Sequence, residues 1–533
     1  MKGPMKKGYL LLLLHAHLPF VRHPEYQNFM EEDWLFEAIT ETYIPLIRMM
    51  ERFEHDRLNY SLTMTISPPL AAMLVDPLLQ ERYIKRLNGL IELSGKEVVR
   101  TKGQPDFRAL AEMYHESYKQ SLNLYKNQYR CNLIQAFRKF QDQGRLDIIT
   151  CGATHGFLPN METVPASARA QIAIACDQYE RLFGRPPSGI WLPECGFQPG
   201  IDRLLNENGI KYFFLDAHGI LHGTPRPKYG VYAPVYCPSG VAAFGRDLDS
   251  SKQVWSAEEG YPGDYDYREF YRDVGFDLPL DIVKPYLHGE GIRANLGIKY
   301  YRITGKGDHK EIYAPKQAMT KAKNHAHHFV KYRERHAERL YDCLGGRVPV
   351  IVSPYDAELF GHWWYEGPKF LEYVIRTVAE ESDVLQLTTA KEYLKAHRTN
   401  QLVTPSFSSW GYMGYSEVWL DGSNDWVYRH VHQASARMTE LAERFSHASG
   451  MIDRILRQAA RELLLAESSD WAFIMKMGTT VDYAKKRVIE HIQNFTRIYE
   501  GIQNNSLDLE WLLKIENKNN LFSDVDWRVY AEK

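Results

Sequence analysis

Cysteine is scarce in this chain of 533 residues, and the few cysteines present are scattered. None of them forms a CxxC pair or follows the spacing of a zinc ribbon. Such a distribution argues against a disulfide framework and against a structural zinc, and it favours a reducing compartment. We therefore expect a cytoplasmic protein. The six cysteines are at positions 131, 151, 176, 195, 237 and 343.

Long apolar runs and an excess of charge are also missing. The apolar run Tyr9–Leu14 follows Lys6 and Lys7, but it is too short for the core of a signal peptide, and no small-residue cleavage site follows it. No stretch is long enough to span a membrane. The formal net charge of −2 gives no electrostatic indication of a nucleic acid or anionic membrane partner. We expect a monomer or a weak homo-oligomer.

Aromatic residues, by contrast, are abundant. They make up 13% of the chain, with 34 tyrosines and 11 tryptophans. One explanation is a large core. The other is a set of flat side chains that stack on the apolar faces of sugar rings. Composition alone does not decide between the two explanations.

Apolar runs alternate with helical patterns over the first 400 residues, which predicts an α/β fold with a parallel sheet. Charged side chains repeatedly follow these runs, which favours a closed barrel over an open sheet. Residues 77–143 are mostly helical and predict an inserted helical segment. After residue 401 only helical spacing remains, so we expect a barrel domain over 1–400 and a helical domain over 401–533. The expected strands are Tyr9–Leu14, Asn59–Ser67, Leu146–Thr150, Gly189–Leu192 and Lys211–Leu215.

Two strand ends carry carboxylates after a proline. Pro193 ends one apolar run and Glu194 follows it; Pro354 interrupts a second run and Asp356 follows that. Proline cannot donate to a sheet ladder, so we expect both strands to end there. A single such glutamate is usually a solvated loop residue. A pair, however, suits a retaining glycosidase, which needs two carboxyl groups roughly 5 to 5.5 Å apart. Glu358 is the rival to Asp356.

Three histidines form a further candidate group. His15 and His17 follow the first expected strand, and His155 follows the third. Imidazoles in this arrangement are compatible with a divalent metal, which keeps a metal-dependent deacetylase open as an alternative. We favour the other interpretation, in which they bind substrate hydroxyls or neighbouring carboxylates.

Other binding candidates lie in loops. Arg246 could fix a carboxylate or a sugar hydroxyl, and Gly263 would let the backbone approach a ligand. As bare sequence, both favour an ordinary polar loop. Trp410, Trp419 and Trp426 crowd the start of the helical region, and tryptophan beside glycine in a loop favours a ligand-facing position.

Five motifs, in this order, resemble those of glycoside hydrolase family 57, and the subgroup of 1,4-α-glucan branching enzymes is the most similar. The resemblance covers nearly the whole chain. It implies a distorted (β/α)7 barrel with a helical insert and a C-terminal all-helical domain that completes the cleft. The motifs are His15–Phe20, Gly152–Gly156, Trp191–Phe197, Tyr355–Trp364 and Ser408–Gly411.

The resemblance also implies roles for individual residues, and it implies no metal and no cofactor. Glu194 resembles the family nucleophile and Asp356 the acid/base. The other positions that we expect to bind substrate are Arg246, Gly263, Trp410, Asp470, His15, His17 and His155, together with the cleft-lining Trp34, Trp255 and Trp419.

We therefore expect a retaining branching enzyme that acts on α-1,4-glucan such as amylose or glycogen, in glycogen biosynthesis. One departure bears on this expectation. Branching members carry a long mobile loop with a tyrosine between the nucleophile and the arginine; here the interval is short, and Tyr229, Tyr232 and Tyr236 are its candidates. A short loop protects the glycosyl-enzyme less well from water. An α-amylase, a 4-α-glucanotransferase and a non-catalytic glucan-binding protein stay open.

Overall fold

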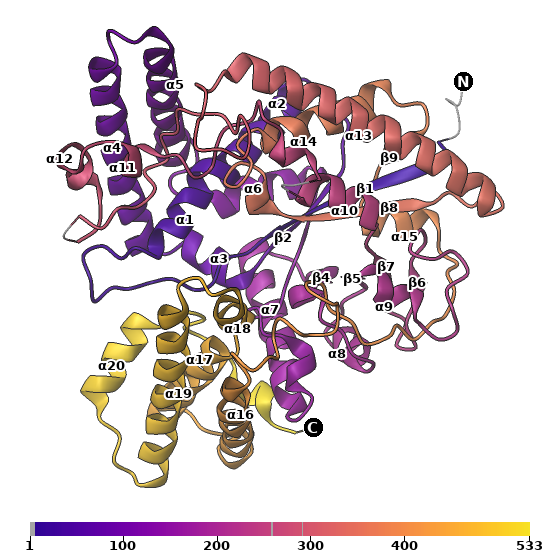
Figure 1. Ribbon diagram of the computed structural model, residues 1–533. Helices are drawn as coiled ribbons and strands as arrows, with labels where there is room; N and C mark the ends of the chain where they lie inside the picture. The colour runs from indigo at the N-terminus through magenta and orange to yellow at the C-terminus, as the bar shows by residue number, and fades with distance from the viewer. Residues whose placement is uncertain (1–5, 257–258, 290, 533) are drawn as a thin grey trace.

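The computed structural model of the protein describes residues 6–256, 259–289 and 291–532 (Figure 1). Its centre is formed by parallel strands that lie in two hydrogen-bonded groups, ordered β3-β2-β1-β8 and β4-β5-β7. These strands are β1 (Gly8–Ala16), β2 (Leu62–Ile66), β3 (Leu146–Ile149), β4 (Gly189–Trp191), β5 (Tyr212–Leu215), β7 (Ala242–Gly245) and β8 (Val350–Asp356).

Backbone hydrogen bonds close the two groups into one ring. Thr150 donates to Gly189 O at 3.2 Å and accepts from Trp191 N at 2.9 Å, which joins the end of β3 to β4. Asp247 N donates to Val352 O at 2.9 Å, which joins the end of β7 to β8. The ring order 1-2-3-4-5-7-8 confirms the predicted seven-unit barrel, in which all strands point the same way and their carboxyl ends meet at one mouth.

The strand β8 corrects the prediction that proline ends the apolar run. It continues through Pro354 to Asp356, in register with β1. Residues two apart in a strand point their N–H groups to the same side. Pro354 therefore faces the same neighbour as Val352, which is β7, and β7 has already ended there. The missing N–H of the proline costs no ladder bond.

Two short strands lie outside the ring. β6 (Val235–Tyr236) pairs antiparallel with β7, and β9 (Leu385–Leu387) pairs with the start of β1. β1 is buried on both faces, as a parallel strand covered by helices should be. The helices that cover the barrel include α2 (Ile44–His55), α6 (Leu133–Asp142), α7 (Pro165–Phe183), α13 (Pro315–Cys343) and α14 (Gly367–Arg376) (Figure 1).

Between β2 and β3 the chain forms a helical hairpin. α4 (Pro77–Arg100) and α5 (Pro105–Leu122) lie side by side at one edge of the molecule (Figure 1). Each begins with proline, which suits a first helical position because that N–H has no helical partner. The Asp76 side chain caps α4 by accepting from Leu79 N.

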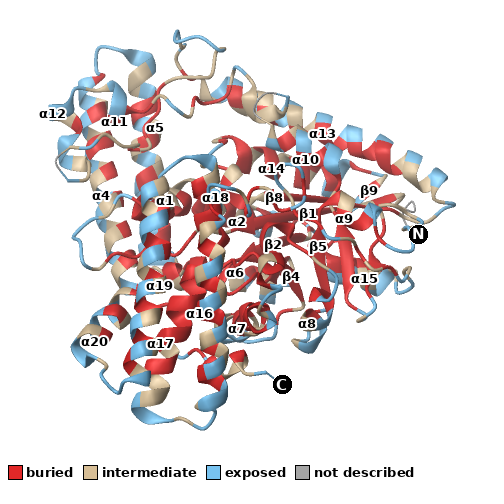
Figure 2. Ribbon diagram, turned by 60° about the horizontal axis from the view of Figure 1, so that its bottom comes forward, coloured by how far each residue is buried: buried red, intermediate tan, exposed pale blue. Residues whose placement is uncertain are grey.

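The C-terminal region is helical and packs on the barrel. α17 and α19 lie against each other, and their buried side chains join the barrel residues in one continuous apolar core. Figure 2 shows buried residues on the strands, and exposed residues on the outward sides of α5 and α20. No helix within the described ranges has the length and apolarity that crossing a membrane requires. The helices are α16 (Trp426–Arg444), α17 (Gly450–Ala466), α18 (Ser469–Met477), α19 (Val481–Gln503) and α20 (Leu509–Lys518).

Candidate active site

Glu194 lies directly after β4, and its backbone is in the left-handed region, with φ 61°. This conformation is unusual for a glutamate and is typical of functional sites. The side chain is 8% exposed, and its carboxylate accepts two hydrogen bonds. Trp410 Nε1 donates to Oε2 at 2.6 Å, and Ser469 Oγ donates to Oε1 at 2.9 Å. Both donors come from the C-terminal part of the chain, so the barrel and the helical region together hold this carboxylate.

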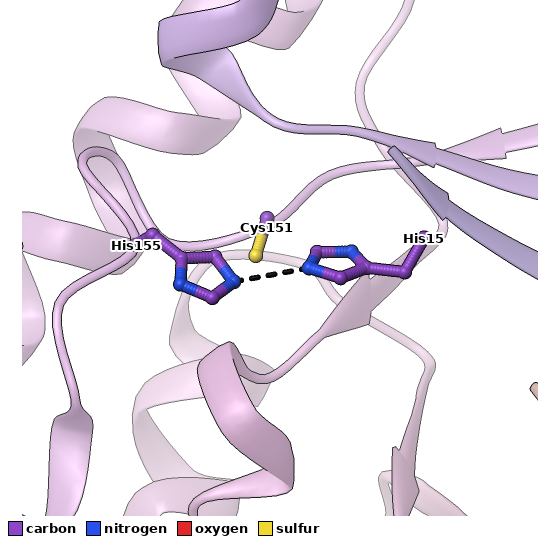
Figure 3. Close-up of side chains that lie close together, drawn as sticks. All are labelled: His15, Cys151 and His155. Atoms are coloured by element: carbon purple, nitrogen blue, oxygen red, sulfur yellow. Dashed lines mark hydrogen bonds between the residues drawn. The ribbon is translucent and has the colours of Figure 1, made fainter. Parts of the chain in front are cut away.

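A chain of hydrogen bonds leads from two histidines to Glu194. His155 Nδ1 lies 2.8 Å from Ser469 Oγ, and the Nε2 atoms of His15 and His155 are 3.0 Å apart (Figure 3). Burial holds the pKa of both imidazoles well below the usual range, so both are neutral. Ser469 gives its one proton to Glu194 and must accept from His155 Nδ1. The lone pair of His155 Nε2 then accepts from His15 Nε2–H.

His17 and Asp470 form an ion pair beside this chain. His17 Nδ1 lies 2.8 Å from Ser67 Oγ, and its Nε2 lies 3.1 Å from Asp470 Oδ2. Burial alone would lower the pKa of His17, but the charge and hydrogen bond of Asp470 outweigh it and raise the pKa. Burial likewise opposes ionisation of Asp470, yet His17 lowers its pKa to about 2. His17 thus brings positive charge toward the carboxylates at the mouth.

Asp356 is the last residue of β8 and pairs in register with His15 on β1. Burial raises its pKa to about 6, against the opposing charges of His17 and Arg246. Among the described residues, none donates a hydrogen bond to this carboxyl group. A carboxyl group without a protein partner and with a raised pKa can give its proton to a ligand.

Glu358, the rival to Asp356, is engaged elsewhere. Its Oε1 accepts from the Tyr43 hydroxyl at 2.5 Å, and burial raises its pKa to about 7. The residue is buried in a turn that follows β8. Because one oxygen is tied to Tyr43, Asp356 is the better placed proton donor.

Arg246 follows β7 and pairs with Asp216, which follows β5. The guanidinium donates to Asp216 Oδ2, and His218 Nδ1 lies 3.3 Å from Asp216 Oδ1. The sequence placed Asp216 at a strand end but did not indicate its role. The signal was present, because Asp216 follows its strand as Glu194 follows β4.

Three expected binding residues lie on other segments. Gly263 ends a short turn, Tyr261–Gly263, and lines an open depression with Lys321 and His325. Trp34, on α1 (Glu32–Ala38), packs edge-to-face against Tyr483 with ring centroids 6.0 Å apart. Trp255 ends α10 (Leu248–Trp255) and is 49% exposed. Contact of these residues with a substrate stays a prediction.

Trp419 corrects the expectation that it lines the cleft. Its side chain is 1% exposed and stacks on Phe157, with ring centroids 5.0 Å apart. The loop after Trp410 turns inward, and the Trp419 indole fills the space under Gly411. In this structure Trp419 is therefore a core residue.

The three tyrosines of the short loop also differ from expectation. Tyr232 O accepts from Val350 N, at the start of β8, and Tyr236 pairs with Ala242, at the start of β7. The Arg347 guanidinium lies over the Tyr229 ring, 4.7 Å from its centroid. All three backbones therefore lie at the amino ends of the strands, at the opposite end from Glu194.

Two groups of donor atoms lie close enough to hold a metal ion: His15, Cys151 and His155, and His17, His155 and Asp470, each within 4.8 Å. Figure 3 shows the Cys151 sulfur beside the two facing imidazoles. Imidazole and thiolate are ligands that zinc accepts. The histidine nitrogens that face one another, however, are already joined by the hydrogen bonds described above. We therefore assign these residues to holding and charging the carboxylates.

Two family models match the chain: Glycosyl hydrolase family 57 over residues 11–405, and 1,4-alpha-glucan branching enzyme, C-terminal, over residues 430–530. The chain is 33% identical to the 1,4-alpha-glucan branching enzyme TK1436 of Thermococcus kodakarensis, over 97% of this chain and 78% of that protein.

Solved structures of the same size share the fold. The alpha-amylase AmyC from Thermotoga maritima has a TM-score of 0.93 at 45% identity, covering 99% of this chain and 100% of that one. The GH57-type branching enzyme from Pyrococcus horikoshii has a TM-score of 0.87 at 31% identity, covering 99% of this chain and 97% of that one. With the matched residues spanning both the barrel and the C-terminal helices, the chain belongs to glycoside hydrolase family 57.

Proposed function

We propose that the protein is a retaining 1,4-α-glucan branching enzyme, with Glu194 as nucleophile and Asp356 as acid/base. One observation carries the assignment. Glu194 is held at the end of β4 by donors from Trp410 and Ser469, while Asp356, at the same end of the barrel, has no protein partner. A fixed carboxylate and a free carboxyl group are what a double displacement requires.

In the first step Glu194 attacks the anomeric carbon of an α-1,4 bond, and Asp356 gives its proton to the leaving oxygen. This forms a covalent glycosyl-enzyme and releases the reducing-end part of the donor. In the second step Asp356 takes the proton of an acceptor 6-hydroxyl, whose oxygen displaces Glu194 from the anomeric carbon. The product is an α-1,6 branch with retained configuration.

The pKa values of the two carboxyl groups bear on this cycle. Burial raises the pKa of Glu194 to about 7, although Trp410 and Ser469 favour its ionised form, and it raises the pKa of Asp356 to about 6. The cycle needs the opposite order, with the proton on Asp356. Asp356 is the more exposed group, so a glucan that covers the site removes more water from it and raises its pKa further.

Matched variants test the roles. Glu194→Gln should abolish turnover of amylose while it retains glucan binding, and retained turnover would refute the nucleophile. Asp356→Asn should lose far more activity than Glu358→Gln. The reverse result would assign the acid/base role to Glu358.

The reaction itself is tested on amylose by counting reducing ends directly, and again after a debranching enzyme. New ends that are seen only after debranching establish transfer to a 6-hydroxyl. No gain on debranching would contradict the branching function.

A second candidate is an α-amylase, in which water takes the place of the acceptor at the same site. Two observations favour it: the 45% identity to the solved alpha-amylase AmyC, and the lack of a long loop between Glu194 and Arg246. Reducing ends would then rise at once. A 4-α-glucanotransferase would instead redistribute chain lengths without branches, and a metal-dependent deacetylase would lose activity with a chelator.

The finer setting belongs to the same proposal. We infer that amylose or glycogen is the substrate, that the protein acts in glycogen biosynthesis in the cytoplasm, and that it is a monomer or weak homo-oligomer. The scattered cysteines and the net charge of −2 support a reducing, soluble setting. We divide the chain into a catalytic barrel over 1–400, with its insert at 77–143, and a helical domain over 401–533.

A further inference from the structure

A short closed loop, residues 409–416, connects the barrel to the C-terminal helices. Ser409 closes it twice: its N–H donates to Gly414 O at 2.8 Å, and its Oγ accepts from Ser416 N at 2.9 Å. The ends of the loop are therefore fixed to each other. We call residues 409–416 the aromatic loop.

Two strand ends of the barrel hold this loop. Trp410 N donates to Glu194 O at 2.8 Å, in addition to the bond from its indole to the Glu194 carboxylate. His218, two residues after the Asp216 that ends β5, lies with Nε2 2.7 Å from Gly414 O. The aromatic loop thus lies over the ends of β4 and β5, directly beside the proposed nucleophile.

The backbone of the loop is unusual for its length. Gly411 has φ 83°, Met413 φ 60°, Gly414 φ 84° and Ser416 φ 78°, all in the left-handed region. Met413 and Ser416 adopt it with a side chain, which is strained. Gly414 has little alternative, since a Cβ there would lie 2.7 Å from His218 Cε1. Strained, well-anchored loops of this kind hold their outer side chains in fixed positions.

Those outer side chains are large and exposed. Tyr412 is 70% exposed, Met413 67% and Tyr415 44%. The Tyr415 ring is nearly parallel to Phe407, at 14°, with centroids 6.3 Å apart. A contiguous exposed group of aromatic side chains beside an active site marks a binding surface.

We propose that Tyr412 and Tyr415 form a glucan-binding surface that holds a polymer chain extending from the catalytic pair. The inference rests on the proposed function, because it takes its ligand class from the reaction at Glu194. A chain bound at Glu194 has to pass over neighbouring surface, and the aromatic loop shares Trp410 with that site. Flat rings with a polar tip suit sugar rings, whose faces are apolar and whose edges carry hydroxyls.

The geometry also favours a glucan over a second copy of this chain or another protein. A protein seated on the aromatic loop would cover the approach to Glu194 and block turnover. A glucan uses the same surface without closing the site. The tyrosines of the short loop before Arg246 lie at the opposite end of the barrel, so Tyr412 and Tyr415 supply exposed tyrosine rings on the catalytic side.

The test measures amylose binding in a Glu194→Gln background, where no turnover consumes the ligand. Tyr412→Ala and Tyr415→Ala should each weaken binding about fivefold, and the double variant should weaken it more. Tyr412→Phe and Tyr415→Phe should bind within about twofold of the parent, because stacking is retained. Tyr332→Ala, an exposed tyrosine on α13, is the matched control and should bind as the parent does.

The outcomes separate the two proposals. A Glu194→Gln parent that binds no amylose overturns the proposed function and this inference with it. A parent that binds amylose equally well with and without Tyr412 and Tyr415 overturns only the inference. Phe variants that bind as weakly as the Ala variants would also overturn it, since stacking would then contribute nothing. Thermal unfolding of each variant checks that the fold is intact.

Discussion

Glu194 shows at the scale of one residue how much stability an active site gives up. Its left-handed backbone costs of order 1–3 kcal/mol. Burial also raises the pKa of its carboxyl group to about 7, from an ordinary value of 4.5. Trp410, Ser469 and the barrel backbone hold the residue in place nevertheless. The site is therefore stabilised by its surroundings, and single changes there should have measurable and signed effects.

The first prediction concerns pH and stability at Glu194. A carboxyl group whose folded pKa is raised binds its proton more tightly in the folded protein, so its stabilising contribution is complete below about pH 4.5 and is lost as the pH rises through 7. Glu194→Gln should therefore gain stability relative to the parent between pH 5 and pH 8, by about 3 kcal/mol. Urea unfolding at the two pH values measures this. An equal difference at both would contradict it, and the exposed Glu81→Gln serves as control.

The second prediction concerns Ser469 as a positioning residue. Ser469→Ala removes a donor from Glu194, so the free energy of ionising that carboxyl group rises and kcat should fall about tenfold or more. The acidic limb of the pH profile should move to higher pH, which a merely structural role would not cause. Ser469→Thr should restore activity. Ser449→Ala, at an exposed serine without a capping bond, should change neither quantity.

At the scale of elements, apolar runs located most barrel strands because buried parallel strands are apolar on both faces. β7 was not predicted: Ala242–Gly245 is short and contains alanine and glycine, which carry little strand signal. The end of β8 was predicted wrongly, because a sequence does not show which neighbour a proline faces. The wrongly placed tyrosines have the same cause, since a loop between two strands can cross either end of the barrel.

The third prediction tests the contact between β4 and β5. Gly189 begins β4, and a Cβ there would lie 2.1 Å from the ring of Tyr212 on β5. That ring cannot move freely, because its hydroxyl donates to Asp147 Oδ2 at 2.6 Å. Gly189→Ala should therefore lower the unfolding free energy by about 2–3 kcal/mol. Gly103→Ala, where a Cβ meets nothing within 4 Å, is the matched control. Equal stability of the two variants would contradict the packing argument.

At the scale of the molecule, the strand-end pattern located Glu194, Asp356 and Arg246, because a barrel gathers strand ends whatever their separation in sequence. It could not indicate that Ser469 or Tyr43 would bind these carboxylates. Serine and tyrosine are common, and which ones meet a carboxylate depends on how distant helices pack. The expected helical region at the C-terminus is present, but its buried side chains share one core with the barrel.

That shared core gives the last prediction. Phe495 on α19 is fully buried in the cluster that also contains the β1 leucines. Because the barrel and the helices bury one another, Phe495→Ala should lower the unfolding free energy of the whole chain by about 3–5 kcal/mol. Amide exchange of β1 should accelerate together with that of α19, and calorimetry should show one transition shifted to lower temperature. Ile489→Ala, at an exposed position of α19, should leave both unchanged. Two transitions, of which only one moves, would mean that the helices unfold as a separate unit and that Ser469 and Asp470 can leave the site while the barrel stays folded.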